Sequence, residues 1–237
     1  MAKTDPGKPR SDTIRAGLDC GILAMKYLQE YNTALLYNAS PVDIKDFVVK
    51  FLQLGLISAA VDLPFIKAFI VYGQMQYCDA ASNCPIFVNP GTIILNEDIV
   101  SDSPEWRFIL AHEAGHWLIN RDRTPRTRSY YTCCKSFSER TDFLDVDRME
   151  HYYTTVPDAL AEIKADCVAN ALLMPPTAFI KCSTELMEQF GFNDHMIIVG
   201  EHPKEEFSVI ARLASVFAVP EYAVRNHLYT LGLYAKN

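Results

Sequence analysis

The sequence lacks a long uninterrupted run of apolar residues and an excess of positive charge, and each absence excludes a class of protein. Its most apolar region is broken, before it reaches membrane-spanning length, by polar residues, charged residues and a proline: Lys50, Gln53, Asp62, Pro64 and Lys67. Residues 1–12 lack the apolar stretch of a secretory signal, so we expect a disordered tail on a cytoplasmic protein with no membrane association. The formal net charge of −7 disfavours direct DNA binding, because a duplex binder needs a positive surface.

The cysteines also lack a recognisable pattern. There are seven, and their spacing matches neither a disulfide framework nor a zinc ribbon. An odd number without paired spacing favours reduced thiols, the state that the cytosol maintains. The adjacent Cys133 and Cys134 leave open a redox pair or a metal site, which is the weaker alternative to ordinary free thiols.

The feature with the clearest chemical meaning is an H-E-x-x-H motif formed by His112, Glu113 and His116. With Ser103 as N-cap, the surrounding sequence predicts a helix over 104–120. Positions four apart share one helix face, so both imidazoles can bind one metal ion, and Glu113 can take a proton from water beside it. The rest of the helix is predicted to be buried by Trp106, Ile109, Leu110, Trp117 and Leu118. Two structural histidines bonded to neighbouring carbonyls are the alternative, but a buried helix with this spacing has few uses other than metal binding.

A catalytic zinc ion needs three protein ligands and an open position, so a third ligand must come from another segment. Residues 158–175, DALAEIKADCVANALLMP, predict a second helix in which Glu162 and Asp166 are again four apart. We assign Glu162 to the metal and Asp166 to the free N–H of a ligating histidine, His112 being favoured. The alternative, a solvated acidic helix face, is weakened by the pairing with H-E-x-x-H. The apolar positions of this helix are Ala159, Leu160, Ile163, Val168, Leu172 and Leu173.

Together these motifs resemble the ImmA/IrrE family of zinc metallopeptidases. The resemblance covers about residues 65–180 and rests on HEAGH at 112–116, Glu162, Ala165-Asp166, Val168-Ala169 and Leu172-Leu173-Met174-Pro175. It implies an α+β fold with a minimal thermolysin-like zincin core, in which a small β-sheet supports the active-site helices and His112, His116 and Glu162 hold zinc. Members of the family cleave helix-turn-helix repressors and so derepress phage, mobile-element or stress genes. The interval between His116 and Glu162 is longer than in the family, which indicates an insertion.

The sequence is expected to divide into a tail with N-terminal helices (1–63), a metallopeptidase core (64–180) and a C-terminal helical segment (181–237). One helix is predicted over 11–31, with its apolar side formed by Ile14, Leu18, Ile22, Met25 and Leu28. Another is predicted to begin at Ser40 as N-cap and to stop at Gly55. Its core face is formed by Ile44, Phe47, Val48, Phe51 and Leu52. We interpret both helices as a scaffold in front of the catalytic unit.

Short β-rich runs at 68–77, 86–88 and 92–95 precede the H-E-x-x-H helix, and Asn89-Pro90-Gly91 joins the last two. An exposed strand edge in this position can hydrogen-bond the extended backbone of a peptide substrate. Residues 73–77 are the candidate edge, and an ordinary strand inside the sheet is the alternative.

Residues 121–156 are the unusual part of the chain and begin with an arginine-rich run, RDRTPRTR. A solvated basic face is the ordinary interpretation, and a loop over the cleft is the functional one. A hydrogen-bond donor to the developing oxyanion is sought here among Tyr130, Tyr131, His151, Tyr152 and Tyr153. None of these candidates is preferred, and His151 as a further metal ligand is a weaker alternative to an exposed histidine.

The C-terminal pattern is typical of a helix-turn-helix, with helices predicted at 207–217 and 221–231 around Ala218-Val219-Pro220. The second helix carries only Arg225 and His227 as basic groups, in an acidic protein. We therefore interpret the segment as a structural or protein-recognition unit rather than a DNA-binding one.

The sequence thus predicts a zinc-dependent endopeptidase in which His112, His116 and Glu162 bind Zn²⁺, Glu113 is the general base and Asp166 orients a histidine. Under the family resemblance, its partner is a protein substrate, a helix-turn-helix repressor. Two alternatives remain: a DNA-binding transcriptional regulator with a structural metal site, and a metallohydrolase acting as an effector or toxin on other substrates. Manganese or iron can also occupy a site of two histidines and a glutamate.

Overall fold

The computed structural model describes residues 11–60, 66–73, 75–78, 85–120, 130–134, 156–192 and 194–235. The fold is α+β, as the sequence predicts. The helices are α1 (Ser11–Asn32), the 3₁₀ turn η1 (Thr33–Leu36), α2 (Ile44–Asp46), the π-helical turn η2 (Phe47–Phe51), α3 (Pro104–Asn120), α5 (Val156–Leu173), α6 (Pro176–Gln189), α7 (Pro203–Phe217) and α8 (Glu221–Thr230). The strands are β1 (Gly55–Ala59), β2 (Ile66–Val71), β3 (Met75–Cys78), β4 (Pro85–Val88), β5 (Thr92–Asn96), β6 (Tyr130–Cys134), β7 (Ile197–Ile198) and β8 (Tyr234–Ala235).

The main sheet has four strands in the order β1-β5-β2-β6. Strands β1 and β5 are parallel, whereas β2 is antiparallel to both β5 and β6. Strands β3 and β4 form a separate antiparallel ribbon, and the short β7 and β8 pair in parallel. The single run predicted over 68–77 is therefore wrong as one strand, because the chain leaves the main sheet after Val71. The part of the candidate substrate edge 73–77 that forms a strand, 75–77, consequently lies in the ribbon and not at an edge of the main sheet.

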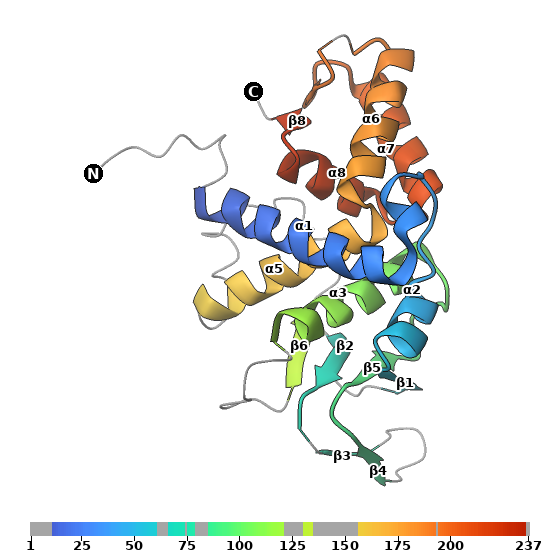
Figure 1. The fold of residues 1–237 in the computed structure, drawn as a ribbon, viewed down its shortest axis with the longest axis vertical. Coiled ribbons are helices and arrows are strands. Elements are labelled where there is room, and N and C mark those ends of the chain that lie inside the picture. The colour runs from blue at the N-terminus through green and yellow to red at the C-terminus, as the bar shows by residue number, and fades with distance from the viewer. Residues whose placement is uncertain are drawn as a thin grey trace, which may run out of the picture.

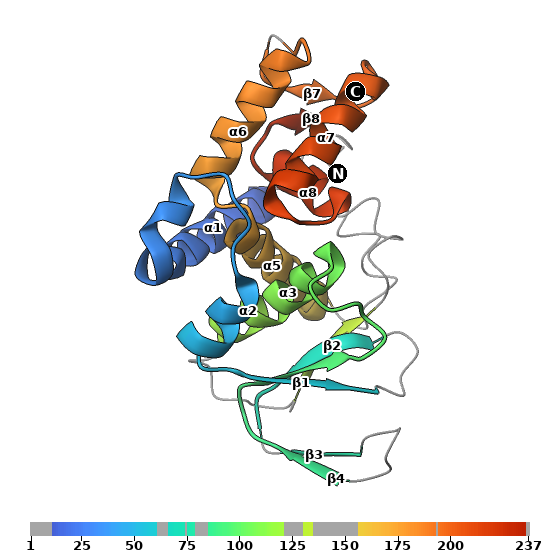
Figure 2. The ribbon, with the colours of Figure 1, turned by 90° about the vertical axis from the view of Figure 1, so that its right-hand side faces the viewer.

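The long helices stack on the main sheet in layers. Helix α3 packs against β2, α5 packs against α3, and α1 covers α5. Figure 2 shows this order clearly, with α3 nearest the sheet and the C-terminal helices at the opposite end of the molecule. Because α3 lies between the sheet and α5, its sequence must be apolar nearly all round, as it is.

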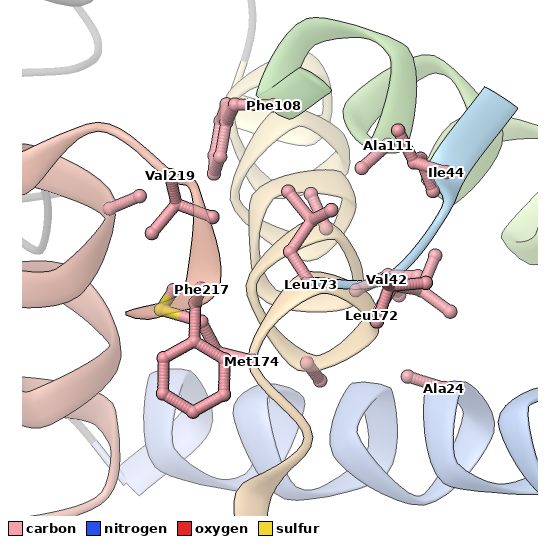
Figure 3. Close-up of a cluster of buried hydrophobic side chains, with 14 of the residues drawn as sticks. Ala24, Val42, Ile44, Phe108, Ala111, Leu172, Leu173, Met174, Phe217 and Val219 are labelled. Atoms are coloured by element: carbon pink, nitrogen blue, oxygen red, sulfur yellow. The ribbon is translucent and has the colours of Figure 1, made fainter. Parts of the chain in front are cut away.

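The C-terminal end of α5 is the centre of the largest hydrophobic cluster. Figure 3 shows Leu172, Leu173 and Met174 meeting side chains from α1, α3, the segment before α2 and the turn after α7. Arg107 of α3 strengthens this junction: its guanidinium donates to the carbonyl oxygens of Ala218, at 3.0 Å, and Val42, at 2.7 Å. The C-terminal unit and the N-terminal segment are thus both anchored to α3.

The segment before α2 differs from its prediction. The helix is capped by Asp43, whose carboxylate accepts from the backbone N–H of Asp46 at 2.9 Å, rather than by Ser40. The carbonyl oxygen of Val42 is bound by Arg107 and its side chain is buried, so the backbone before Asp43 stays outside the helix. Gly55 begins β1 instead of ending the helix, and Gln53, between η2 and β1, has a left-handed backbone conformation with a φ of 56°.

Two residues predicted to be buried are exposed. Ile22 of α1 is 63% exposed, because α1 turns its smaller residues Cys20 and Ala24 towards the core. Small side chains allow the close packing of α1 on α5. Leu160 of α5 is 40% exposed, since it lies two positions, about 200° of helix rotation, from the buried Glu162.

The C-terminal segment contains the predicted pair of helices. Helix α7 ends where Ala218 adopts a left-handed conformation, φ 52°, and α8 leaves at an angle of 103°. Figure 1 places this pair beside α6, away from the sheet. Among the described helices, none is by itself long and apolar enough to cross a membrane; α7 and α8 reach that length and hydropathy only as this bent pair.

Candidate metal centre

Helix α3 begins as its sequence predicts. The hydroxyl of Ser103 accepts a hydrogen bond from the backbone N–H of Trp106 at 3.1 Å, which is the N-cap arrangement. The helix then carries His112, Glu113 and His116 into the interior, where all three have no exposed surface. Three fully buried titratable side chains in one helical turn are costly unless they interact with one another or with a ligand.

A glycine within the motif allows the second helix to come close. A β-carbon built on Gly115 would lie 2.8 Å from the carbonyl oxygen of Ala165 and 3.3 Å from the β-carbon of Val168. Glycine is therefore the residue that this crossing of α3 and α5 accepts without displacement. The close crossing brings Glu162, three residues before Ala165, to the histidines.

The side chains of His112, His116 and Glu162 converge in this interface. The two Nε2 atoms lie 3.0 Å apart, and each lies close to a different oxygen of Glu162: 3.1 Å from His112 and 3.2 Å from His116. In a tetrahedral site with metal–ligand bonds of about 2.0–2.1 Å, ligand atoms are about 3.3 Å apart. The observed triangle is close to that size, and the three buried residues could hold a metal ion.

Asp166 lies on the opposite side of the His112 ring. The Nδ1 atom of His112 donates to Oδ1 of Asp166 at 2.6 Å, and both side chains are buried. This contact holds the proton on Nδ1 and leaves Nε2 directed at His116 and Glu162. The structure thus pairs Asp166 with the histidine favoured in the sequence analysis.

The charges of this cluster depend on one another. Burial by itself would lower the pKa of His112, but Asp166 and Glu162 outweigh burial and raise it to about 10. Burial would likewise raise the pKa of Glu162, yet His116 and His112 hold it far below its usual value. Without a cation, the carboxylates therefore keep both ring nitrogens of His112 protonated. A metal ion that binds Nε2 must displace the proton on that nitrogen, so metal binding releases protons and strengthens as pH rises.

Glu113 is next to the ligand triangle but does not belong to it. Both of its carboxylate oxygens are buried and have no hydrogen-bond partner among the described residues. Burial raises its pKa to about 7, against the lowering effects of His116 and His112. The backbone N–H of Ile70 in β2 has a smaller lowering effect on this pKa, although it makes no hydrogen bond to the carboxylate. A carboxylate with a pKa near neutrality can accept and return a proton at physiological pH.

Some predicted site residues lie outside the described residues. These are His151, Tyr152 and Tyr153, together with the side chains of Tyr130, Tyr131, Cys133 and Cys134. The backbone of 130–134 forms β6, so this part of the predicted loop over the cleft is a strand of the main sheet.

Sequence reasoning missed two contributors to the site. The first is Gly115, and its signal was available, because glycine disfavours a helix interior unless close packing requires it. The second is the backbone of Ile70, which nothing in the sequence connected with Glu113.

Comparisons with models of protein families and with curated proteins find no significant match to this chain.

Proposed function

We propose that this chain is a cytoplasmic zinc-dependent endopeptidase of the ImmA/IrrE type, built on a minimal thermolysin-like core. The observation that carries the proposal is the convergence of His112, His116 and Glu162, with a buried, unpartnered carboxylate beside them on the same helix. Two histidines and one glutamate leave one position of a tetrahedral site free, as catalytic zinc sites do. A sheet with an antiparallel strand next to the motif helix agrees with the proposed core.

The donor set fits zinc. Two imidazole nitrogens and one carboxylate are the ligands that catalytic zinc takes in several peptidases. Bound zinc would polarise a peptide carbonyl and make nearby water more acidic. Asp166 orients His112 for that ion, and the close contact at Gly115 keeps Glu162 within reach.

In this reaction Glu113 moves the proton. It takes a proton from the attacking water and returns it to the nitrogen of the leaving amine, so that the carboxylate is regenerated. Its surroundings suit this role, because burial raises its pKa to about 7 and no described side chain forms a hydrogen bond with its oxygens. The surrounding apolar residues of α3 and α5 exclude bulk water, which strengthens each of these electrostatic interactions.

The proposed substrate is a protein, a helix-turn-helix transcriptional repressor, and the resemblance of the two metal-binding motifs supports this choice. Direct DNA binding by the chain itself is less well supported. Of the two basic residues of α8, His227 is only 3% exposed, and Arg225 pairs with Glu221 at 3.3 Å. This leaves α8 without a free positive face.

The test is cleavage by the metal-loaded protein of the helix-turn-helix regulators encoded next to it, followed by mass spectrometry. We expect one or a few defined cuts, which disappear when a chelator is added and return when zinc is restored. In Glu113→Gln, cleavage should be lost while the zinc content, measured by elemental analysis, remains close to one per chain, because Glu113 is not a ligand.

Glu188→Gln is the matched control, because this glutamate is on α6 and its side chain is 61% exposed. It should retain full cleavage. Undiminished cleavage by Glu113→Gln would rule out the proposed mechanism. Salt-sensitive binding to promoter DNA that Glu113→Gln leaves unchanged would instead favour the transcriptional regulator with a structural metal site.

A further inference from the structure

Strand β2 packs against the helix that carries the proposed catalytic base. Within the main sheet, helix α3 packs chiefly against β2. The backbone of Ile70 in this strand is close enough to Glu113 to influence the pKa of its carboxyl group. Lys67 of β2 also forms an ion pair with Glu105 in the first turn of α3. Among the strands that the structure describes, β2 is therefore the one along which an extended peptide would pair closest to Glu113.

The two edges of β2 are both taken within this chain. One is paired with β5, inside the sheet, and the other is paired with β6. The pairing of β6 is antiparallel, with Tyr131 opposite Ile70 and Tyr130 opposite Val71. Thus β6 pairs with the part of β2 that contains Ile70.

Strand β6 comes from the interval between His116 and Glu162, which the sequence analysis identified as an insertion. One strand edge accepts one partner, because its N–H and C=O groups are used up by the first strand that pairs with it. We propose that β6, residues Tyr130–Cys134, is a built-in competitor that occupies the substrate-binding edge of β2 and must leave before a peptide substrate can bind. This inference rests on the proposed peptidase function.

Tethering makes such a competitor effective. A segment held on the same chain has an effective concentration of roughly millimolar at its site, far above that of most protein substrates. Only molecules in which β6 is unpaired can bind substrate, so the apparent affinity falls in proportion to their fraction. Only a substrate with additional contacts elsewhere on the protein can displace β6, so the device favours a specific partner over unfolded chains in general.

The direct test uses a fluorescent peptide with the sequence of residues 129–135 and serine at both cysteine positions. It is added to zinc-loaded Glu113→Gln protein, which cannot cleave it, and binding is followed by fluorescence polarisation. Two further variants in this background, Tyr131→Pro and Thr132→Pro, form a matched pair. Each substitution removes one backbone N–H group. Because β6 is the outer strand and neighbouring residues alternate, the N–H of one of these two residues points towards β2 and the N–H of the other points away from it.

We expect at least tenfold tighter peptide binding in the variant that loses the inward N–H. The peptide affinity of the other proline variant should stay closer to that of the Glu113→Gln protein without a proline. Zinc content and cooperative unfolding verify that each variant is folded. Equal, weak binding in all three proteins would overturn the inference.

Hydrogen exchange on the unmodified protein gives a second measurement that depends on no substitution. Excess peptide should speed exchange of the backbone amides of 130–134 while those of 66–71 remain protected. Unchanged exchange in 130–134 at saturating peptide would also overturn the inference.

Cleavage assays with Glu113 intact separate this inference from the proposed function. If a proline variant binds peptide tightly but cleaves neither peptide nor an unfolded protein, β6 is a competitor but the chain is not a peptidase. If the unmodified chain and both proline variants cleave an unfolded protein equally, the chain is a peptidase but β6 is not a competitor. If both are right, release of β6 should raise kcat/KM for the unfolded protein at least tenfold, mainly through a lower KM.

Discussion

Gly115 of α3 lies directly against the backbone of Ala165 in α5, so closely that a β-carbon at position 115 would be 2.8 Å from the Ala165 carbonyl oxygen. Because that oxygen belongs to the backbone, a methyl group can be accommodated only if the helices move apart. In Gly115→Ala we expect the free energy of unfolding to fall by about 1–3 kcal/mol, which is typical of overpacking. Zinc affinity, measured by chelator competition, should fall about tenfold, or about 1.4 kcal/mol, because Glu162 moves with α5.

The matched control is Gly21→Ala in α1. Gly21 is also helical, but a β-carbon there would meet no atom within 4 Å. Alanine should therefore stabilise the protein by about 0.5–1 kcal/mol through its better helix propensity and leave zinc affinity unchanged. Equal behaviour of the two variants would show that the close crossing does not position the site.

The contact between His112 and Asp166 gives a second prediction. Asp166→Asn keeps the size of the side chain but removes the charge that holds His112 in position. Loss of such a partner typically lowers metal affinity about 10- to 100-fold. Isothermal titration with zinc at constant pH should show this loss and also a change in the number of protons released, because Asp166 helps to raise the pKa of His112. Unaltered affinity and proton release would mean that the carboxylate is only structural.

Part of this site could be derived from the sequence because its signals are local. Ser103 and Pro104 define the start of α3, and the spacing of four between His112 and His116 defines a shared face. Glu162 can be the third ligand only if α5 crosses α3 closely beside the two histidines. The H-E-x-x-H motif alone does not predict this crossing, whereas the structure shows it in the contact between Gly115 and Ala165.

The missed elements depend on interactions between distant segments. Gly55–Ala59 is a short apolar run that fits either a helix end or a strand, and only its parallel pairing with β5 decides. For residues 121–156 the sequence indicates a solvated basic face, with a loop over the cleft as the alternative, yet residues 130–134 within this range pair with β2. On α1, the helical spacing predicts that the larger Ile22 lies in the core, whereas packing on α5 selects the small Ala24.

Glu113 makes a third prediction, which concerns stability without metal. Its folded-state pKa of about 7 is above the ordinary value of 4.5, so the native state binds more protons than the unfolded state between these pH values. Its effect on stability is therefore unfavourable above pH 7 and disappears below about pH 4.5. Glu113→Gln should stabilise the metal-free protein by up to about 3 kcal/mol at pH 8 and by much less at pH 5. Urea unfolding at both pH values, in the presence of a chelator, measures the difference; an equal gain at both would contradict the assignment.

His227 of α8 has the opposite pH dependence. Its ring is buried beside Phe179, at 4.6 Å between centroids, and its Nε2 has no partner among the described residues. Burial lowers its pKa to about 4, against the opposing hydrogen bond with the backbone of Met174. The unfolded chain therefore takes up a proton near pH 6.5 that the native protein takes up only near pH 4, and stability falls as pH drops through this interval.

Between pH 7 and pH 5, this difference should cost about 2 kcal/mol of unfolding free energy. In His227→Phe, which keeps an aromatic ring but cannot be protonated, that part of the pH dependence should disappear, although the lost hydrogen bond lowers stability at both pH values by about 1 kcal/mol. His195→Gln is the control, because it removes a histidine whose side chain is 45% exposed rather than buried. Urea titrations of the three metal-free proteins at both pH values give the comparison. If His227→Phe loses as much stability between pH 7 and pH 5 as the unmodified protein, His227 is not the buried neutral group that weakens the fold in acid.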